Sequence, residues 1–151
     1  MRVGGWFPVL EMLVEVYSPS GGYGFCVGGD SRVYFAADAF VRATDGPPPI
    51  AGERVEVHDV RPRTDTKQAD KARRVVRLDP PLKVVGRVRS FDHRAGWGFA
   101  DGTDGKQYFL HRSDMRQPWL PAAGDGVEFF AGLRNNKPRA CYAQPVVQTS
   151  P

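Results

Sequence analysis

Cysteine is scarce in this sequence, which has only Cys26 and Cys141 among its 151 residues. The two lie far apart and form no Cys-x-x-Cys pair, so the spacing of a disulfide framework or a zinc site is missing. The three histidines are equally scattered. We therefore expect both cysteines to be small core residues, the chain to work in a reducing cytoplasm, and no metal or other cofactor to be bound.

Long apolar runs and catalytic motifs are also missing. No apolar run approaches the length that crosses a bilayer, and Met1–Leu10 lacks the apolar core and cleavage site of a signal peptide. The sequence contains no glycine-rich phosphate loop with lysine, no Ser-His-Asp elbow and no metal-binding signature. These absences argue against a membrane partner and against an enzyme, and they favour a binding protein.

Turn-forming residues, by contrast, are abundant. The chain has 17 glycines and 13 prolines, and it shows no long helical periodicity. This composition favours a turn-rich, all-β chain. The formal charge of +4 and the pI near 9.3 permit a nucleic-acid partner without requiring one.

The clearest pattern spans residues 95–112. Its two halves alternate strictly, as β-strands with two different faces do, and Asp101–Gly105 between them is dense in turn formers, so a hairpin is predicted. One face carries Trp97, Phe99, Phe109 and His111, and the other carries Gly98, Ala100, Tyr108 and Leu110.

Only one of these faces can be buried in a small barrel. The preceding strand adds Arg89 to the face of His111, and that face is the costlier one to remove from water. We therefore expect an outward face with the rings of Phe91, Trp97, Phe99 and Phe109. Exposed rings flanked by cations suit a single-stranded nucleic acid, because bases stack on the rings while phosphates meet the cations.

These residues resemble the motifs of a known family. Gly96–Phe99 and Tyr108–His111 resemble the two ribonucleoprotein-type motifs of cold-shock domains, and Gly86–Asp92 resembles the first strand of that family. Gly124–Phe129 and Ala140–Ala143 resemble its fourth and fifth strands, so the resemblance covers about residues 84–147. It implies a five-stranded barrel of the OB type that binds single-stranded RNA or DNA.

Three positions depart from the family pattern. Ser90 stands where the family usually has tryptophan, Gln107 where it has an acid, and Arg112 where it often has phenylalanine. Two stacking platforms of the family are therefore not expected here, at Ser90 and Arg112, although Trp97 restores an indole on the neighbouring strand.

The same pattern occurs earlier in the chain, so the sequence contains an internal repeat. The matching segments are Leu13–Ser18, Gly22–Cys26, Val33–Ala36, Gly52–Val57 and Ala72–Val75. We therefore predict two five-stranded antiparallel OB-type barrels in tandem. The expected parts are an N-terminal arm (1–10), a diverged cold-shock-like domain (11–79), a short Pro-rich linker (80–82), a second cold-shock-like domain (83–147) and a tail (148–151).

The expected outward face of the first domain differs from that of the second. It keeps the rings of Tyr17, Tyr23, Phe25 and Tyr34. Glu15 replaces the cation of Arg89 and Ala36 replaces His111, so this face should bind nucleic acid less well. The alternative is that the first domain is a structural partner whose rings are partly covered, or that it offers a surface to a protein partner.

Two further features keep two interpretations each. Trp119, in the Pro-rich loop after the third strand, either extends the stacking surface or plugs the end of the barrel. The cations between Arg61 and Arg74 form either a solvated loop or a phosphate-contacting arm.

The sequence as a whole predicts a single-stranded nucleic-acid binding protein, acting as an RNA chaperone or as a regulator of transcription or translation. Stacking is expected from Phe91, Trp97, Phe99, Phe109 and His111, and charge from Arg89, Lys106 and Arg112. The alternative function is a protein-interaction module that keeps the fold and has largely lost nucleic-acid binding, because neither half keeps the first-strand tryptophan (Val16 and Ser90).

Overall fold

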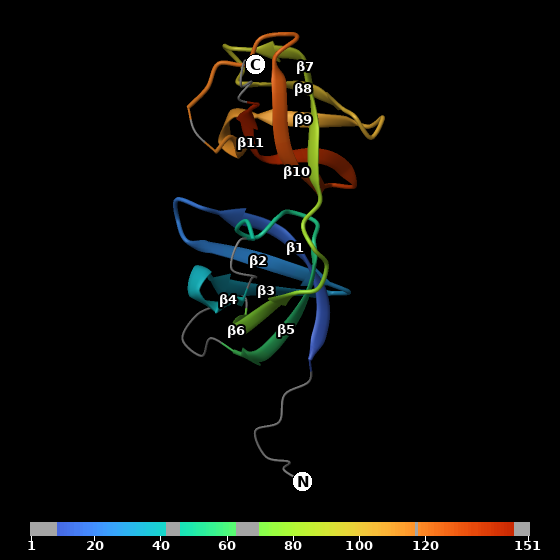
Figure 1. Cartoon of the computed structure of the whole chain (residues 1–151). Helices are drawn as coiled ribbons and strands as arrows, with labels where there is room; N and C mark the ends of the chain where they lie inside the picture. Colours follow the sequence, from blue (N-terminus) through green and yellow to red (C-terminus); the bar gives the residue numbers. More distant parts are fainter. Residues whose placement is uncertain (1–8, 42–45, 63–69, 117, 147–151) are drawn as a thin grey trace. The chain divides into compact units, whose positions relative to one another are not determined.

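A computed structural model describes residues 9–41, 46–62, 70–116 and 118–146. Within them the secondary structure consists of eleven strands and two single-turn 3-10 helices, so the all-β class is confirmed. No helix in the described part of the chain is long and apolar enough to cross a membrane. The chain divides into two compact units, Met1–Pro80 and Pro81–Pro151 (Figure 1).

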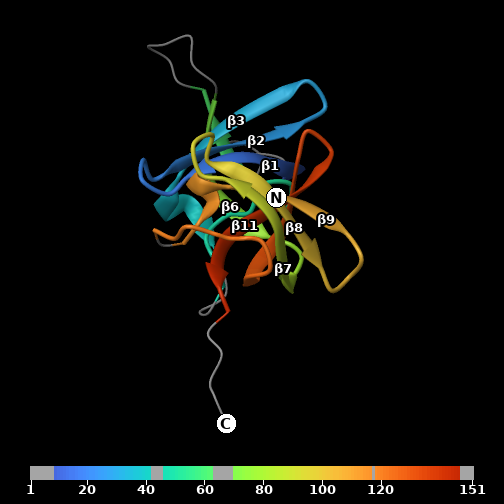
Figure 2. The same ribbon diagram turned by 90° about the horizontal axis from the view of Figure 1, so that it is seen from above.

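The first unit is a closed five-stranded barrel. Its elements are β1 (Leu10–Ser18), β2 (Tyr23–Gly28), β3 (Ser31–Ala36), the 3-10 helix η1 (Ala37–Ala39), β4 (Phe40–Val41), β5 (Arg54–Arg61) and β6 (Asp70–Arg77). The strand order is β3-β2-β1-β5-β6, a parallel pairing of β3 with β6 closes the ring, and the short β4 adds to β6. Figure 2 shows β1, β2 and β3 side by side, as their antiparallel pairing requires.

The second unit repeats this topology. Its elements are β7 (Lys83–Asp92), β8 (Trp97–Gly102), β9 (Gln107–His111), the 3-10 helix η2 (Arg112–Asp114), β10 (Gly126–Arg134) and β11 (Lys137–Pro145). The strands close in the order β10-β11-β9-β8-β7, and the pairing of β11 with β9 is parallel. Both units therefore have the strand order of an OB-type barrel, as predicted.

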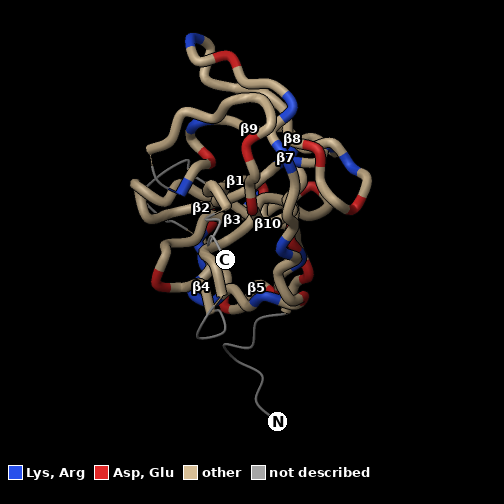
Figure 3. The backbone as a smooth tube through the Cα atoms, turned by 45° about the horizontal axis from the view of Figure 1, so that its top comes forward, with Lys and Arg blue, Asp and Glu red and all other residues tan. Residues whose placement is uncertain are grey.

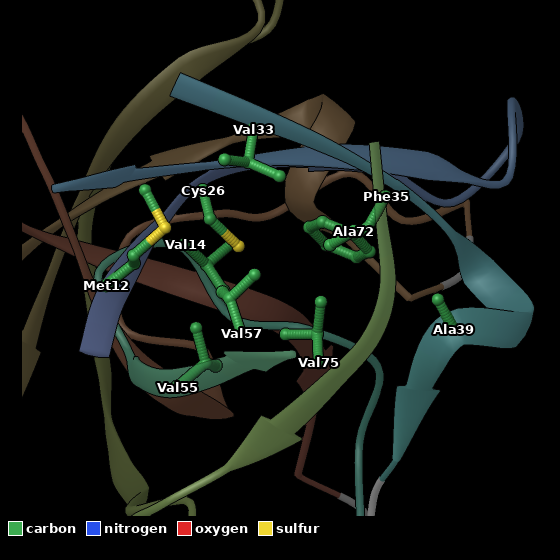
Figure 4. Packing of buried hydrophobic residues seen from close by; sticks show 10 residues of the cluster. All are labelled: Met12, Val14, Cys26, Val33, Phe35, Ala39, Val55, Val57, Ala72 and Val75. Carbon is green, nitrogen blue, oxygen red and sulfur yellow. The ribbon is translucent and has the colours of Figure 1, made fainter. Parts of the chain in front are cut away.

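Each barrel encloses its own apolar core. Figure 4 shows the first core, where side chains from different strands point toward one another; it consists of Met12, Val14, Cys26, Val33, Phe35, Ala39, Val55, Val57, Ala72 and Val75. The second consists of Val84, Val88, Ala100, Tyr108, Leu110, Val127, Phe129, Ala140 and Ala143. Cys26 is fully buried, and this burial raises the pKa of its thiol to about 12, so the thiol stays protonated.

The register confirms the internal repeat position by position. Val14 pairs with Cys26 in the first barrel, and Val88 pairs with Ala100 in the second. By the same comparison, Tyr23 opposite Ala36 corresponds to Trp97 opposite His111. The two barrels can therefore be compared residue by residue.

A β-bulge in β7 changes the predicted faces. The pairing with β8 shifts by one residue between Val88 and Ser90, so that Phe91 pairs with the buried Gly98. Paired residues lie on the same face of a sheet, and an inserted residue reverses the alternation that follows it. Phe91 consequently packs against the barrel core, and the prediction that it lies on the outer face was wrong.

The first barrel has the same bulge, between Val14 and Val16 of β1. Tyr17 therefore pairs with the buried Gly24 and stacks on the core residue Phe35, with ring centroids 6.1 Å apart and planes at 11°. The outward placement predicted for Tyr17 was wrong for the same reason. The bulge itself places Glu15 and its counterpart Arg89 in solvent.

A buried ion pair holds the proline-rich loop of the first barrel. Arg77 and Glu53 form two hydrogen bonds of 2.7 and 2.8 Å, and their side chains are only 7% and 10% exposed. Arg77 also donates to the carbonyl of Pro48, and Glu53 accepts from the backbone of Ile50. These contacts fix the loop to the end of β6.

Candidate nucleic-acid interface

The outer face of the second barrel carries a cluster of three rings, Trp97, Phe99 and Phe109. Trp97 lies nearly parallel to Phe109, with centroids 6.0 Å apart and planes at 28°. Phe99 meets both of the others edge to face, at 6.0 and 5.9 Å. Trp97 is 42% exposed, and the two phenylalanines are half-buried against one another. Cross-strand pairing holds the three rings in these positions. Because none of the three is fully buried, part of the aromatic surface stays accessible to a flat ligand.

His111 extends this cluster along β9. Its ring centroid lies 6.1 Å from that of Phe109. Its Nδ1 accepts a hydrogen bond of 3.0 Å from the backbone N–H of Ser113 and lies 2.8 Å from the Ser113 hydroxyl. A nitrogen that accepts is unprotonated, so the neutral ring carries its proton on Nε2, where it can donate to a ligand.

Two cations near these rings are held by carboxylates. The Nε of Arg89 lies 3.0 Å from Asp101, and both side chains are about half exposed. Arg139 lies under Phe109, with its Cζ 5.4 Å from the ring centroid, and it donates to Asp114 at 2.6 Å. Burial raises the pKa of Asp114 above its ordinary value, although the nearby positive charge of Arg139 acts in the opposite direction. The Asp114–Arg139 pair thus fixes a cation beside the ring, whereas Arg89 is exposed.

Three further residues of this barrel were predicted at the site: Arg112, Lys106 and Trp119. Arg112 packs its guanidinium against Gly96, in the space where a Cβ would lie. Lys106 lies exposed in the turn between β8 and β9. Trp119 packs against the core of the barrel, so the structure favours the alternative in which it plugs the barrel end.

The first barrel carries an equivalent cluster of Tyr23, Phe25 and Tyr34. Tyr23 and Tyr34 lie nearly parallel, 6.0 Å apart at 21°, and Phe25 meets Tyr34 edge to face at 5.7 Å. Tyr23 is 42% exposed, like Trp97. The ring geometry of the second barrel is therefore repeated, with tyrosines in place of Trp97 and Phe109.

Charge compensation occurs at both clusters, through different partners. In the first barrel, the Nε of Arg32 lies 2.8 Å from Glu15, and its guanidinium carbon lies 3.8 Å from the centroid of Phe25. Glu15 at the bulge of the first barrel thus pairs with Arg32, and Arg89 at the bulge of the second barrel pairs with Asp101. In Figure 3, basic and acidic residues are interspersed along both barrels.

Sequence reasoning missed Arg32, Asp101 and Arg139 as neighbours of the rings. Arg32 lies two residues before Tyr34 on the same strand, and strand alternation alone would place it on the same face. Asp101 follows by the same rule from Phe99. Arg139 carries no such signal, because its contact with Phe109 depends on the parallel closure of the barrel.

The described residues contain no group of three or more His, Cys, Asp or Glu side chains that could hold a metal ion. No family model and no curated protein matches the sequence. Among solved structures, one described as Drosophila Unr CSD456 is similar, at 18% identity and a TM-score of 0.39, over 94% of this chain and 64% of that one. The strand pairing by itself shows that the chain is a tandem repeat of two OB-type barrels.

Proposed function

We propose that the chain binds single-stranded RNA or DNA, mainly through the outer face of its second barrel. The observation that carries the proposal is the half-exposed cluster of Trp97, Phe99 and Phe109 on that face. Bases of any sequence stack on such rings, so weak sequence preference follows. His111 adds a fourth flat ring and a hydrogen-bond donor, and Arg89, Lys106 and Arg112 supply charge around them.

The resemblance to cold-shock domains suggests the wider role. A protein that covers single strands with weak preference can act as an RNA chaperone or as a regulator of transcription or translation. Neither role needs a catalytic site or a cofactor. Two reduced cysteines suit a cytoplasmic location, which belongs to the same proposal.

A titration of the full chain with a labelled, mixed-sequence oligonucleotide tests this function. We expect saturable binding whose affinity falls with salt, with a slope for single strands of about −0.7 per neutralised phosphate. Because Arg89 and Arg139 already have carboxylate partners, only a few phosphates should contribute. A folded chain that binds no oligonucleotide at low salt would contradict the proposal.

A second candidate function concerns the first barrel, as a surface for a protein partner. Its outer face is more apolar, because Leu13 and Val27 stand where the second barrel has Arg87 and Asp101. Leu13 is 46% exposed. This candidate gains support if the folded chain fails to bind any oligonucleotide.

A further inference from the structure

We propose that Arg32 is a specificity-determining residue that caps Phe25 and keeps bases from stacking on that ring of the first barrel. The inference rests on the proposed function of the chain. It explains by geometry why one of two similar clusters would be the main nucleic-acid site.

The contact itself is close. The guanidinium carbon of Arg32 lies 3.8 Å from the centroid of the Phe25 ring. Carbon atoms in van der Waals contact are about 3.5–4.0 Å apart, so the guanidinium occupies the layer in which a base would stack. A base and the guanidinium cannot occupy this layer of Phe25 together, and Arg32 must leave before a base can enter.

A second contact holds the cap in place. The Nε of Arg32 lies 2.8 Å from Oε1 of Glu15 and donates to it. Glu15 reaches this position because the bulge in β1 turns it toward solvent beside β2. Its carboxylate therefore positions the cation and also neutralises it, which leaves less charge for a phosphate.

The second barrel has neither partner of this cap. Gln107 occupies the position of Arg32, since it pairs with Asp101 as Arg32 pairs with Val27. Arg89 occupies the position of Glu15 and pairs with Asp101 instead. The two barrels therefore share their rings and differ in the residue beside them.

The two contacts of Arg32 are expected to lower the oligonucleotide affinity of the first barrel by a measurable factor. A cation–π contact at an exposed site and an exposed ion pair together correspond to roughly a 3- to 30-fold change in an equilibrium constant. Arg32 and Glu15 are 51% and 42% exposed, which places both contacts toward the weaker end. We therefore expect removal of the cap to raise the affinity of the first barrel about 3- to 10-fold.

The test uses the full chain with the second cluster disabled by Trp97→Ala and Phe109→Ala. Binding of a labelled mixed-sequence oligonucleotide is measured at low salt before and after adding Arg32→Gln, which installs the residue of the second barrel. The cap predicts a rise in affinity although a positive charge is lost, whereas simple electrostatics predicts a fall. This opposite sign makes the experiment decisive.

Arg54→Gln is the matched control. Arg54 is also a half-exposed, ion-paired arginine of the first barrel, and it donates to Glu11 and Asp79. Its replacement should leave the affinity unchanged or lower it. Circular dichroism and thermal melting establish that each variant is folded.

Each result separates the cap from the proposed function. If the unmodified chain binds and Arg32→Gln lowers the affinity, leaves it unchanged, or fails to restore lost binding, the cap is overturned while the function stands. If the folded, unmodified chain binds nothing, the proposed function fails and the cap fails with it.

A second measurement does not depend on the disabled background. In the NMR spectrum of the full chain, side-chain protons of Arg32 held over a ring should be shifted upfield, and Phe25→Leu should abolish this shift. Ordinary shifts for Arg32 in the unmodified chain would overturn the cap directly.

Discussion

Trp97 and Trp119 are the same residue type in different surroundings, and we expect different roles for them. Trp97 is 42% exposed beside Phe99 and Phe109, whereas Trp119 packs against the barrel core. Trp97→Ala should weaken oligonucleotide binding by about 1–3 kcal/mol and leave the fold intact, because only a surface ring is lost. Fluorescence anisotropy with an unfolding curve for the same variant measures both effects.

Trp119→Ala is the matched control in the same barrel. It should lower the free energy of unfolding and have a smaller effect on the affinity of the folded chain. Equal binding by the Trp97→Ala variant and the unmodified chain would contradict the stacking role.

Single carboxylates also set the response to acid. Hydrogen bonds lower the pKa of Asp79 (from Arg54), Asp104 (from Tyr108) and Glu128 (from Gln144) below their ordinary values of 3.8, 3.8 and 4.5. A lowered pKa contributes stability above the ordinary value, and this stability is lost as the pH falls through the folded value. Burial raises the pKa of Asp114, so its contribution runs in the opposite direction and offsets part of the loss.

We therefore expect the melting temperature to fall as the pH is lowered from about 5 to 3. Thermal melting followed by circular dichroism across this range checks the prediction. In Glu128→Gln, one of the three contributions is removed and the fall should be shallower. A melting temperature that rises on acidification would show that Asp114 dominates.

Much of the site was predictable from the sequence at this scale. Strand alternation alone placed Trp97, Phe99 and Phe109 on one face, because side chains of a strand alternate and polar partners mark the solvent side. It could not give the partner of Arg89, since Asp101 lies on another strand and their pairing needs the register.

The bulges are the decisive feature at the scale of the strand. In β7 the chain passes so close to β8 that a Cβ on Gly98 would lie 2.0 Å from the Ser90 carbonyl oxygen and 2.6 Å from the Cα of Phe91. Both are backbone atoms, so one strand would have to move. Gly98→Ala should therefore lower the free energy of unfolding by about 1–3 kcal/mol or more, which urea denaturation measures.

Gly126→Ala serves as its control in the same barrel. A Cβ there would meet Val146 at 3.4 Å, which is ordinary contact. Its effect on stability should be small. If both variants lose the same stability, the close approach at Gly98 is not the cause.

Beyond each bulge, strand alternation no longer predicts which side chains face solvent. The sequence pattern Arg89-Ser90-Phe91 continues the alternation smoothly, so it predicts Phe91 outside. An inserted residue leaves no signature in polarity, and only the paired glycine on the neighbouring strand hints at it.

At the scale of the whole molecule, the two units have separate cores and unequal faces. We expect residues 81–151 alone to bind an oligonucleotide and residues 1–80 alone to bind it much more weakly. The first unit offers Tyr23 and Ala36 in place of Trp97 and His111, and the loss of one stacking platform corresponds to about 1–3 kcal/mol. Separate titrations, with circular dichroism to check folding, measure the difference.

Equal affinities of the two folded units would contradict this asymmetry. From the sequence, the asymmetry was expected because Glu15 stands where the second barrel has Arg89. The structure changes that reason, because Arg32 neutralises Glu15 and Asp101 neutralises Arg89. The expected difference in affinity now depends on the rings, Trp97 and His111 against Tyr23 and Ala36, and on Arg32, which covers Phe25.

The repeat made the architecture of the whole molecule readable from the sequence. Two sets of five segments in the same order predicted two barrels, and the register agrees position by position. The ion pair of Arg77 with Glu53 was not predictable in this way, because it joins a loop to a distant strand and has no counterpart in the repeat.

The parallel pairing that closes each barrel also bears on the order in which the chain folds. Hairpins join neighbours in sequence and form early, whereas β9 and β11 meet only after a long segment has been ordered. Among the described residues these two strands share one pair, Phe109 with Arg139, against three pairs between β3 and β6. Amide protection should therefore be lower on this side of β9 than on its side facing β8. Under the proposed function, such local opening would let the strand that carries Phe109 and His111 adjust to a bound base while the rest of the barrel stays folded.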